Sequence, residues 1–187
     1  MKPAPEPDED RDLGPDADPE SVARKILLDQ LTGRARTRAE LAKKLAQRNV
    51  PDDVATRLLD RFEEVGLVDD ADFARQWVEQ RRTGRGLARR ALAQELRRKG
   101  VDDETVGAAL AEVDPDDELD VARALVRRKL RSVQGLEPEK ATRRLVGMLA
   151  RKGHSAGTAY RVVREELVSA GFGTGAIELA DPEHSGP

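Results

Sequence analysis

The chain has 187 residues and a mass of 20.6 kDa, and 37% of its residues are charged while only 3% are aromatic. No run of about 18 apolar residues occurs, and the first 20 residues carry eight acids, so we expect neither a membrane-spanning helix nor a secretory signal. There are no cysteines, which excludes a disulfide framework, a thiolate metal site and a cysteine nucleophile, and fits a protein of the cytoplasm.

The net charge of −3 conceals a segregation of charge along the chain. Residues 1–20 carry eight acids, two bases and five of the ten prolines, so this segment cannot bury enough apolar surface to offset its ordering entropy. Residues 171–187 carry three acids and no lysine or arginine. Both ends are therefore predicted to be disordered tails, and the body between them holds 31 bases against 25 acids.

From residue 21 onward, apolar residues recur at helical spacing and no alternating strand pattern occurs. Asp18-Pro19 and Asp114-Pro115 each place a cap residue before a proline, and Thr37–Glu40 forms a capping box. Acidic pairs such as Asp69-Asp70 and Asp102-Asp103 fall where helices should begin, and the helix dipole favours them there. The pattern predicts an all-α protein with about nine helices.

A repeat organises these helices. Residues 45–53 align with residues 96–104 at an offset of 51, and residues 149–157 follow at a further offset of 53. The first helices of the second and third units are only 48 residues apart, so the third unit has about five extra residues, around 131–138.

The chain is therefore predicted to contain three tandem three-helix repeats. Because each unit alone is small for a stable core, neighbours should pack together and form an elongated, curved helical array. The predicted division of the chain is tail 1–20, repeats 21–68, 69–113 and 114–170, and tail 171–187.

The middle unit carries a distinctive combination of residues. It contains Gly66-Leu-Val-Asp-Asp-Ala-Asp-Phe-Ala-Arg75, Arg81-Arg-Thr-Gly-Arg-Gly-Leu87 and Gln94-Glu-Leu-Arg-Arg-Lys-Gly-Val101, and the first unit contains Thr37-Arg-Ala-Glu-Leu41. Over residues 21–170 this combination resembles the RecX family, the bacterial regulators of RecA recombinase. Where that family has an aromatic residue after Lys-Gly in its third unit, this chain has His154.

The resemblance implies the same three-unit architecture and a partner. It implies a monomer that binds RecA and its single-stranded DNA filament, with a weak direct contact to DNA. It further implies inhibition of RecA ATPase and strand exchange, and thereby of homologous recombination and the SOS response in DNA repair. Neither a cofactor nor a membrane partner is implied.

Catalysis is not predicted. Of the two histidines, His184 lies in the C-terminal tail and His154 occupies the position of Val50 and Val101, so His154 is interpreted as a packing residue. The glycine-rich string 171–175 follows a helix rather than a strand, which argues against a phosphate-binding loop. We expect no enzyme, no metal and no cofactor.

Basic residues are more informative. Between residues 75 and 99, nine bases face only two acids, an excess that a solvated helix surface does not readily neutralise. Guanidinium groups bind phosphates and carboxylates alike, so the charges alone do not separate a nucleic-acid surface from an acidic protein groove. With the resemblance, the candidate surface for RecA and DNA comprises Arg81, Arg82, Arg85, Arg89, Arg90, Arg97, Arg98, Lys99, Arg143, Arg144, Arg151 and Lys152.

The alternative function is that of a stand-alone helical DNA-binding or architectural protein, since each unit has the size of a three-helix DNA-binding domain. Against it, aromatic residues that could stack on single strands are scarce in the body, and most of them, Trp77 among them, occupy core-like positions. An inert helical scaffold is a third alternative.

Overall fold

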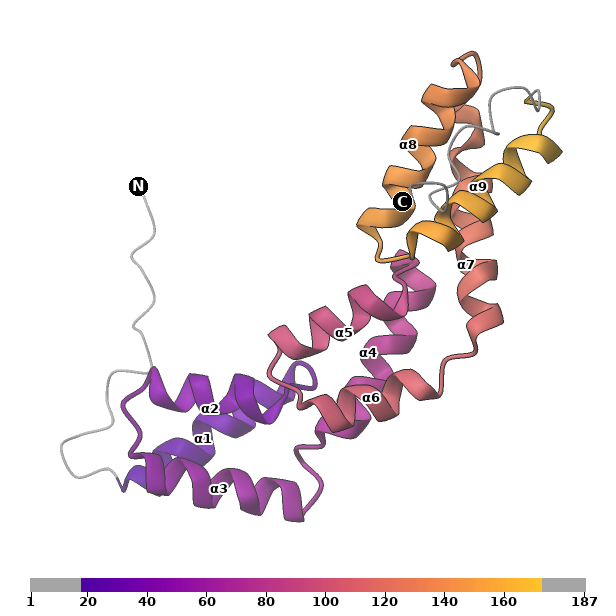
Figure 1. Cartoon of the computed structure of the whole chain (residues 1–187). Helices are drawn as coiled ribbons and strands as arrows, with labels where there is room; N and C mark the ends of the chain where they lie inside the picture. The colour runs from indigo at the N-terminus through magenta and orange to yellow at the C-terminus, as the bar shows by residue number, and fades with distance from the viewer. Residues whose placement is uncertain (1–17, 173–187) are drawn as a thin grey trace, which may run out of the picture. The chain divides into compact units, whose positions relative to one another are not determined.

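The computed structural model describes residues 18–172, and all regular secondary structure within them is helical (Figure 1). The elements are α1 Pro19–Thr32, α2 Arg38–Ala46, α3 Asp52–Glu64, α4 Asp70–Arg85, α5 Arg89–Arg98, α6 Asp103–Ala111, α7 Pro115–Lys129, the 3₁₀ helix η2 Leu130–Val133, α8 Pro138–Arg151 and α9 Ala156–Ser169. The all-α prediction is confirmed, as are the three tandem three-helix repeats. Apart from residues 18–20 and 171–172, the predicted tails lie outside the described residues. The curvature expected for the array stays a prediction.

The described residues fall into two compact units that do not coincide with single repeats. The first unit holds the helices of the first repeat, the start of α4 up to Phe73, and the short segment Lys99–Val101. The second unit holds Ala74–Arg98 and the residues from Asp102 onward. The turn after α5 therefore belongs with the first repeat rather than with its own.

The predicted helix starts are confirmed by their hydrogen bonds. The Asp18 carboxylate accepts from the backbone N–H groups of Glu20 and Ser21, and the Asp114 carboxylate accepts from the N–H of Asp116. Thr37 and Glu40 form the complete capping box. These bonds satisfy N–H groups that a helix leaves without a partner in its first turn.

The core of the first unit is formed by α1, α2 and α3, which pack against one another (Figure 1). Its cluster of buried residues is aliphatic apart from the ring of Phe62. Leu27, Leu41 and Leu45 are fully buried. Small aliphatic side chains are sufficient here because three short helices enclose little volume, which agrees with the low aromatic content.

In the second unit, α9 packs against both α7 and α8. The residues that make the third repeat longer form η2 and the turn before Pro138, and Val133 at the end of η2 is completely buried in the core of this repeat. The insertion therefore contributes to the core. In the second repeat, α5 packs against α6 through Leu92, Leu96 and Val106, which are all buried.

Trp77 lies at the edge of the second repeat and is only half-buried. Its indole Nε1–H donates to the Glu95 carboxylate at 2.9 Å, and the Arg81 guanidinium lies 4.0 Å from the centre of its ring. The side chain therefore joins an apolar face to a charged surface, which differs from the core-like position that the helical spacing predicts.

The turn after α8 makes a close contact with the start of α5. Gly153 has a φ of +89°, and a Cβ placed on it would lie 2.6 Å from the Cβ of Ala91. Gly135 has a similar φ of +81°, but nothing lies within 4 Å of such an added atom. The two positions therefore share the backbone requirement for glycine and differ in packing.

Substituting these two glycines separates the effects. Gly135→Ala should lower the free energy of unfolding by about 1–2 kcal/mol, because only left-handed backbone strain is introduced. Gly153→Ala should cost a further 1–3 kcal/mol or so, because the added methyl also displaces α5. Urea denaturation followed by circular dichroism measures both, and equal losses would contradict the close packing of Gly153 against Ala91.

Candidate binding surface

A repeated junction positions the basic side chains. In the first unit, the start of α2 docks on the turn Lys99–Val101: the Thr37 hydroxyl donates to the carbonyl of Lys99 at 2.6 Å. The carboxylate of Asp70, at the start of α4, accepts from the backbone N–H of Arg38 at 2.8 Å. The next repeat thus supplies a partner to the free N–H groups at the start of α2. The Asp69-Asp70 pair, which the sequence assigns to capping of its own helix, therefore also caps a neighbouring one.

At this junction the charge of Lys99 is compensated by an ion pair. Lys99 Nζ lies 2.7 Å from Glu40 Oε1, and the two side chains are only 20% and 26% exposed. Partial burial acts to raise the pKa of the Glu40 carboxyl, but the hydrogen bond and the charge of Lys99 outweigh it and the pKa is lowered. The ammonium group also lies 5.4 Å from the centre of the Phe73 ring.

The second unit contains the same junction one repeat later. The backbone N–H of Ala88 donates to the carbonyl of Lys152 at 2.9 Å, and the Glu118 carboxylate accepts from the N–H of Arg89 at 3.1 Å. By the repeat offsets, Ala88 corresponds to Thr37, Lys152 to Lys99 and Glu118 to Asp70. The start of α5 is thus held by the third repeat as the start of α2 is held by the second.

The charges at this second junction differ. The residue that corresponds to Glu40 is Ala91, so Lys152 has no equivalent carboxylate. Its ammonium group donates instead to the backbone carbonyl of Arg85. Burial, and then the charges of Arg128, Arg85 and Lys129, lower the pKa of Lys152. We refer to Lys152, Arg85, Arg128 and Lys129 as the Lys152 cluster.

His154 closes the same junction from inside. It is 4% exposed, its Nε2 lies 3.3 Å from the carbonyl oxygen of Gly86, and its Nδ1 lies 3.9 Å from Glu118 Oε1. The interpretation of His154 as a packing residue is confirmed by its burial. Burial is also the main cause that lowers its pKa; the carbonyl of Gly86 and the charge of Glu118 oppose this, and Lys152 adds to it.

Four of the twelve candidate bases are held in ion pairs within their units. Arg81 faces Glu95, Arg82 lies between Glu79 and Asp117, Arg97 pairs with Asp103, and Lys99 pairs with Glu40. Their charges are largely compensated. Glu79 and Glu95 were counted in the sequence window 75–99, whereas Glu40, Asp103 and Asp117 lie outside it.

The other eight have no ion pair among residues 18–172. Arg89 and Lys152 are half-buried, and six are exposed: Arg85, Arg90, Arg98, Arg143, Arg144 and Arg151. The Arg98 guanidinium donates only to the backbone carbonyl of Gln94. The structure brings Arg85 and Lys152 together in the Lys152 cluster, with two bases outside the predicted set, Arg128 and Lys129. The run of bases at the end of α7 was the sequence signal for that pair.

The start of α5 is also unusual in its charge. Arg89 and Arg90 are its first two residues, and its first turn contains no acid. Cations there oppose the helix dipole, which disfavours them by about 0.3–1 kcal/mol each at an exposed site. Stability alone therefore does not explain these two arginines.

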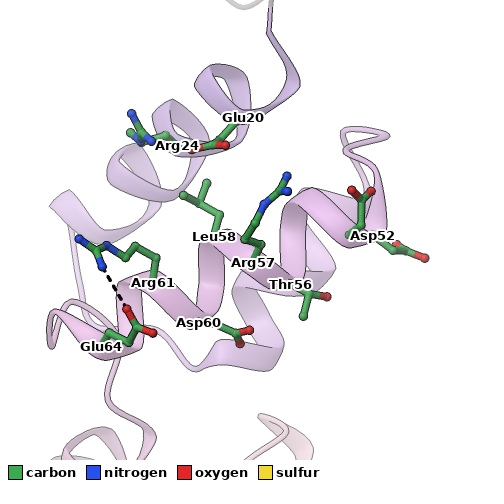
Figure 2. Close-up of a pocket in the computed structure, with 10 residues that line it drawn as sticks. Glu20, Arg24, Asp52, Thr56, Arg57, Leu58, Asp60, Arg61 and Glu64 are labelled. Carbon is green, nitrogen blue, oxygen red and sulfur yellow. Dashed lines mark hydrogen bonds and ion pairs between the residues drawn. The ribbon is translucent and has the colours of Figure 1, made fainter.

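A different surface lies between α1 and α3, where a groove of about 780 Å³ opens (Figure 2). Of its lining residues, five are acids and three are arginines, and Arg61 pairs with Glu64 across 3.2 Å. Leu58 is the single apolar residue of the lining. A net negative lining does not suit a polyanion, so this groove is a poor candidate for DNA.

Two other features are absent from residues 18–172. No group of three or more His, Asp or Glu side chains there is arranged to hold a metal ion. No helix in that range has the length and apolar character needed to cross a membrane.

Fold and surface together define a class: an all-helical protein of three tandem three-helix repeats whose surface presents many bases. Family models match each repeat separately, described as the first, second and third three-helix domains of RecX, at residues 23–62, 69–110 and 116–163. The chain belongs to the RecX family.

Individual relatives agree with this assignment. The chain is 55% identical over 173 residues to the regulatory protein RecX of Thermobifida fusca, covering 91% of this chain and 92% of that protein. It is 52% identical over 160 residues to the regulatory protein RecX of Streptomyces coelicolor, covering 86% and 85%. The crystal structure of RecX from Lactobacillus salivarius superposes with a TM-score of 0.74 at 19% identity, over 81% of this chain and 99% of that one.

The burial of His154 predicts a pH dependence of stability. Because its pKa is lower in the folded chain than the ordinary value of 6.5, the unfolded chain binds more protons as the pH falls below 6.5. The free energy of unfolding should then decrease by up to about 1.4 kcal/mol per pH unit until the folded pKa is reached. His154→Val, which places the residue of Val50 and Val101 in the third repeat, should abolish this decrease.

Urea denaturation between about pH 7.5 and about pH 5.5 measures the effect, since ordinary carboxyl groups titrate mostly below this range. An equal decrease in the wild type and in His154→Val would contradict the assignment to His154.

Proposed function

We propose that this protein is a regulator that binds RecA and its single-stranded DNA filament and inhibits RecA ATPase and strand exchange, and with them recombination and the SOS response. The observation that carries the proposal is the match of all three repeats to RecX domains, together with relatives named regulatory protein RecX. The same names support a regulator rather than an enzyme. We place it in the cytoplasm, as a monomer.

The charges supply a physical basis for binding. Eight candidate bases lack an internal carboxylate partner among residues 18–172, and they are distributed over α4, α5 and α8. Contacts that are individually weak add up when several modules on one chain engage a repeating partner. A protein filament that carries a polyanion offers such a partner, and a deep pocket is not required.

Inhibition would follow from bridging. ATP turnover and strand exchange require neighbouring protomers of the filament to move relative to one another, and a chain bound to more than one of them opposes that movement. In this mechanism the repeats act as a brace and no residue performs chemistry.

The proposal is tested by the steady-state ATPase of RecA filaments on single-stranded DNA with increasing amounts of this protein. ATP turnover should decrease and reach a plateau, because bound chains restrain the protomers. Co-sedimentation with the filaments should saturate over the same concentrations. Unchanged ATPase at saturating protein would refute the proposed inhibition.

The contribution of the bases at the end of α4 and the start of α5 is tested by changing Arg85, Arg89 and Arg90 to Glu. At least tenfold more protein should be needed for the same inhibition. The helix content should stay unchanged, because acids suit the first turn of α5 and Arg85 is an exposed residue at the end of α4. The matched control reverses three exposed bases of the first unit, Lys25, Lys43 and Arg57, and thus changes the net charge equally. Equal loss in both variants would show a general effect of charge and remove this surface from the proposal.

The alternative, a stand-alone DNA-binding protein, is distinguished by salt. A protein held by phosphate contacts alone loses affinity steeply with salt, with a slope near −0.9 per contact on duplex DNA. Binding to DNA-free RecA that tolerates salt favours the regulator.

A further inference from the structure

The two junctions can be compared with each other because equivalent positions are hydrogen-bonded in both. The donor to the lysine carbonyl is the Thr37 hydroxyl in the first and the Ala88 backbone N–H in the second. In each, a lysine carbonyl accepts from the cap residue of the second helix of the preceding repeat, α2 or α5. A carboxylate accepts from the N–H of the first residue of the same helix. Each also has a glycine of positive φ directly after the lysine. The two lysines, Lys99 and Lys152, therefore occupy equivalent places in the fold.

Their electrostatic surroundings are opposite. Lys99 has the Glu40 carboxylate at 2.7 Å, whereas Lys152 has Ala91 at that position and three cations nearby. None of Arg85, Arg128 and Lys129 forms an ion pair with any residue in the range 18–172. The second junction thus concentrates four basic groups where the first contains a neutral pair.

Helix ends do not account for this concentration. Arg85 is the last residue of α4, Lys129 is the last of α7, and Lys152 caps α8. Each helix end provides the equivalent of about half a negative charge, so three ends offset about 1.5 charges, and less if they are partly exposed to water. Four bases exceed that. Burial first, and then the charges of the other three bases, lower the pKa of Lys152.

We propose that the Lys152 cluster is a binding site for a phosphate group of the nucleic-acid backbone, which takes the role that the Glu40 carboxylate has at the first junction. This inference rests on the proposed function for the source of the phosphate, the single-stranded DNA of the filament. The recognition is of charge and does not depend on base sequence.

Phosphate fits better than an acidic protein surface for two reasons. Protein interfaces centre on buried aromatic or apolar anchors. In residues 18–172 none of the large exposed apolar side chains lies on α4, α7 or α8, which carry the cluster or end beside it: Leu28, Val65, Leu67, Tyr160 and Val168. Four bases also exceed what one carboxylate neutralises, whereas a nucleic acid presents a continuous row of phosphates. The absence of an aromatic residue from the cluster argues for contact with the backbone rather than with stacked bases.

The test uses the full chain without RecA and a fluorescent single-stranded oligo(dT), with anisotropy measured over a range of salt. The variants are Arg128→Gln/Lys129→Gln and Lys152→Gln. The matched control, Arg161→Gln/Arg164→Gln, removes two exposed bases from α9 of the same repeat.

The cluster double variant should bind at least tenfold more weakly at low salt. Its plot of log affinity against log salt should be flatter by about 0.7 for each phosphate of the single strand that the variant no longer binds. Lys152→Gln should also weaken binding yet leave the melting temperature equal or higher, because it relieves repulsion among the cations. The control should keep the affinity and slope of the wild type.

Equal decreases in affinity in the cluster and control variants, or no measurable binding by the wild type, would overturn the phosphate site. So would a cluster variant that binds oligo(dT) normally and is weakened only in its affinity for RecA, since the site would then recognise an acidic protein. Inhibition of RecA ATPase by the wild type is measured separately. If the wild type does not inhibit but the cluster variant binds DNA more weakly, the proposed function is refuted and the phosphate site is supported.

Discussion

The structure depends on one constraint: the first N–H groups of a helix have no partner within that helix, and α2 and α5 obtain partners from the next repeat. At α2 the Asp70 carboxylate accepts from the N–H of Arg38, and the Lys99 carbonyl accepts from the Thr37 hydroxyl. At α5 the Lys152 carbonyl and the Glu118 carboxylate accept from the N–H groups of Ala88 and Arg89. Each repeat is too small to bury a large core, so the hydrogen bonds that join repeats also complete each repeat's own helices. The glycine after each lysine follows from this, since the turn must approach the neighbouring helix more closely than a side chain permits.

The same constraint divides the bases into two groups. Arg82 and Lys99 are fixed by carboxylates that the fold brings to them, and their charges contribute to packing. Within residues 18–172, Arg90 and the bases of the Lys152 cluster have no such carboxylate. The charges of Arg89 and Arg90 at the start of α5 also oppose the helix dipole. The ion pairs reduce the apparent excess of charge in the middle repeat and leave a smaller set of bases for a partner.

Local features of the fold could be predicted from the sequence because their signals are local. The Thr37–Glu40 capping box, the Asp114-Pro115 start and the extra residues of the third repeat appear where spacing places them. Pairings across long separations could not be predicted: Lys99 and Glu40 are 59 residues apart, and the acid beside His154 lies on another helix. Trp77 has the spacing of a core residue, but hydrogen bonding of its indole to Glu95 keeps it at the surface edge.

Repetition explains how one junction could become a site while its equivalent stays structural. Hydrogen bonds to the lysine carbonyl hold the lysine in equivalent places in both junctions, whichever residue stands at the position of Glu40. A carboxylate there makes a neutral pair, and alanine leaves the cation available, at a cost that the lowered pKa of Lys152 reflects. In the proposed site, a phosphate from outside the chain supplies the counter-charge. In this RecX chain the other described α-helices begin with an acid in the first turn or with a side-chain cap. In contrast, α5 begins with two arginines beside the second junction. The neighbouring helix ends there already carry more basic charge than their dipoles offset.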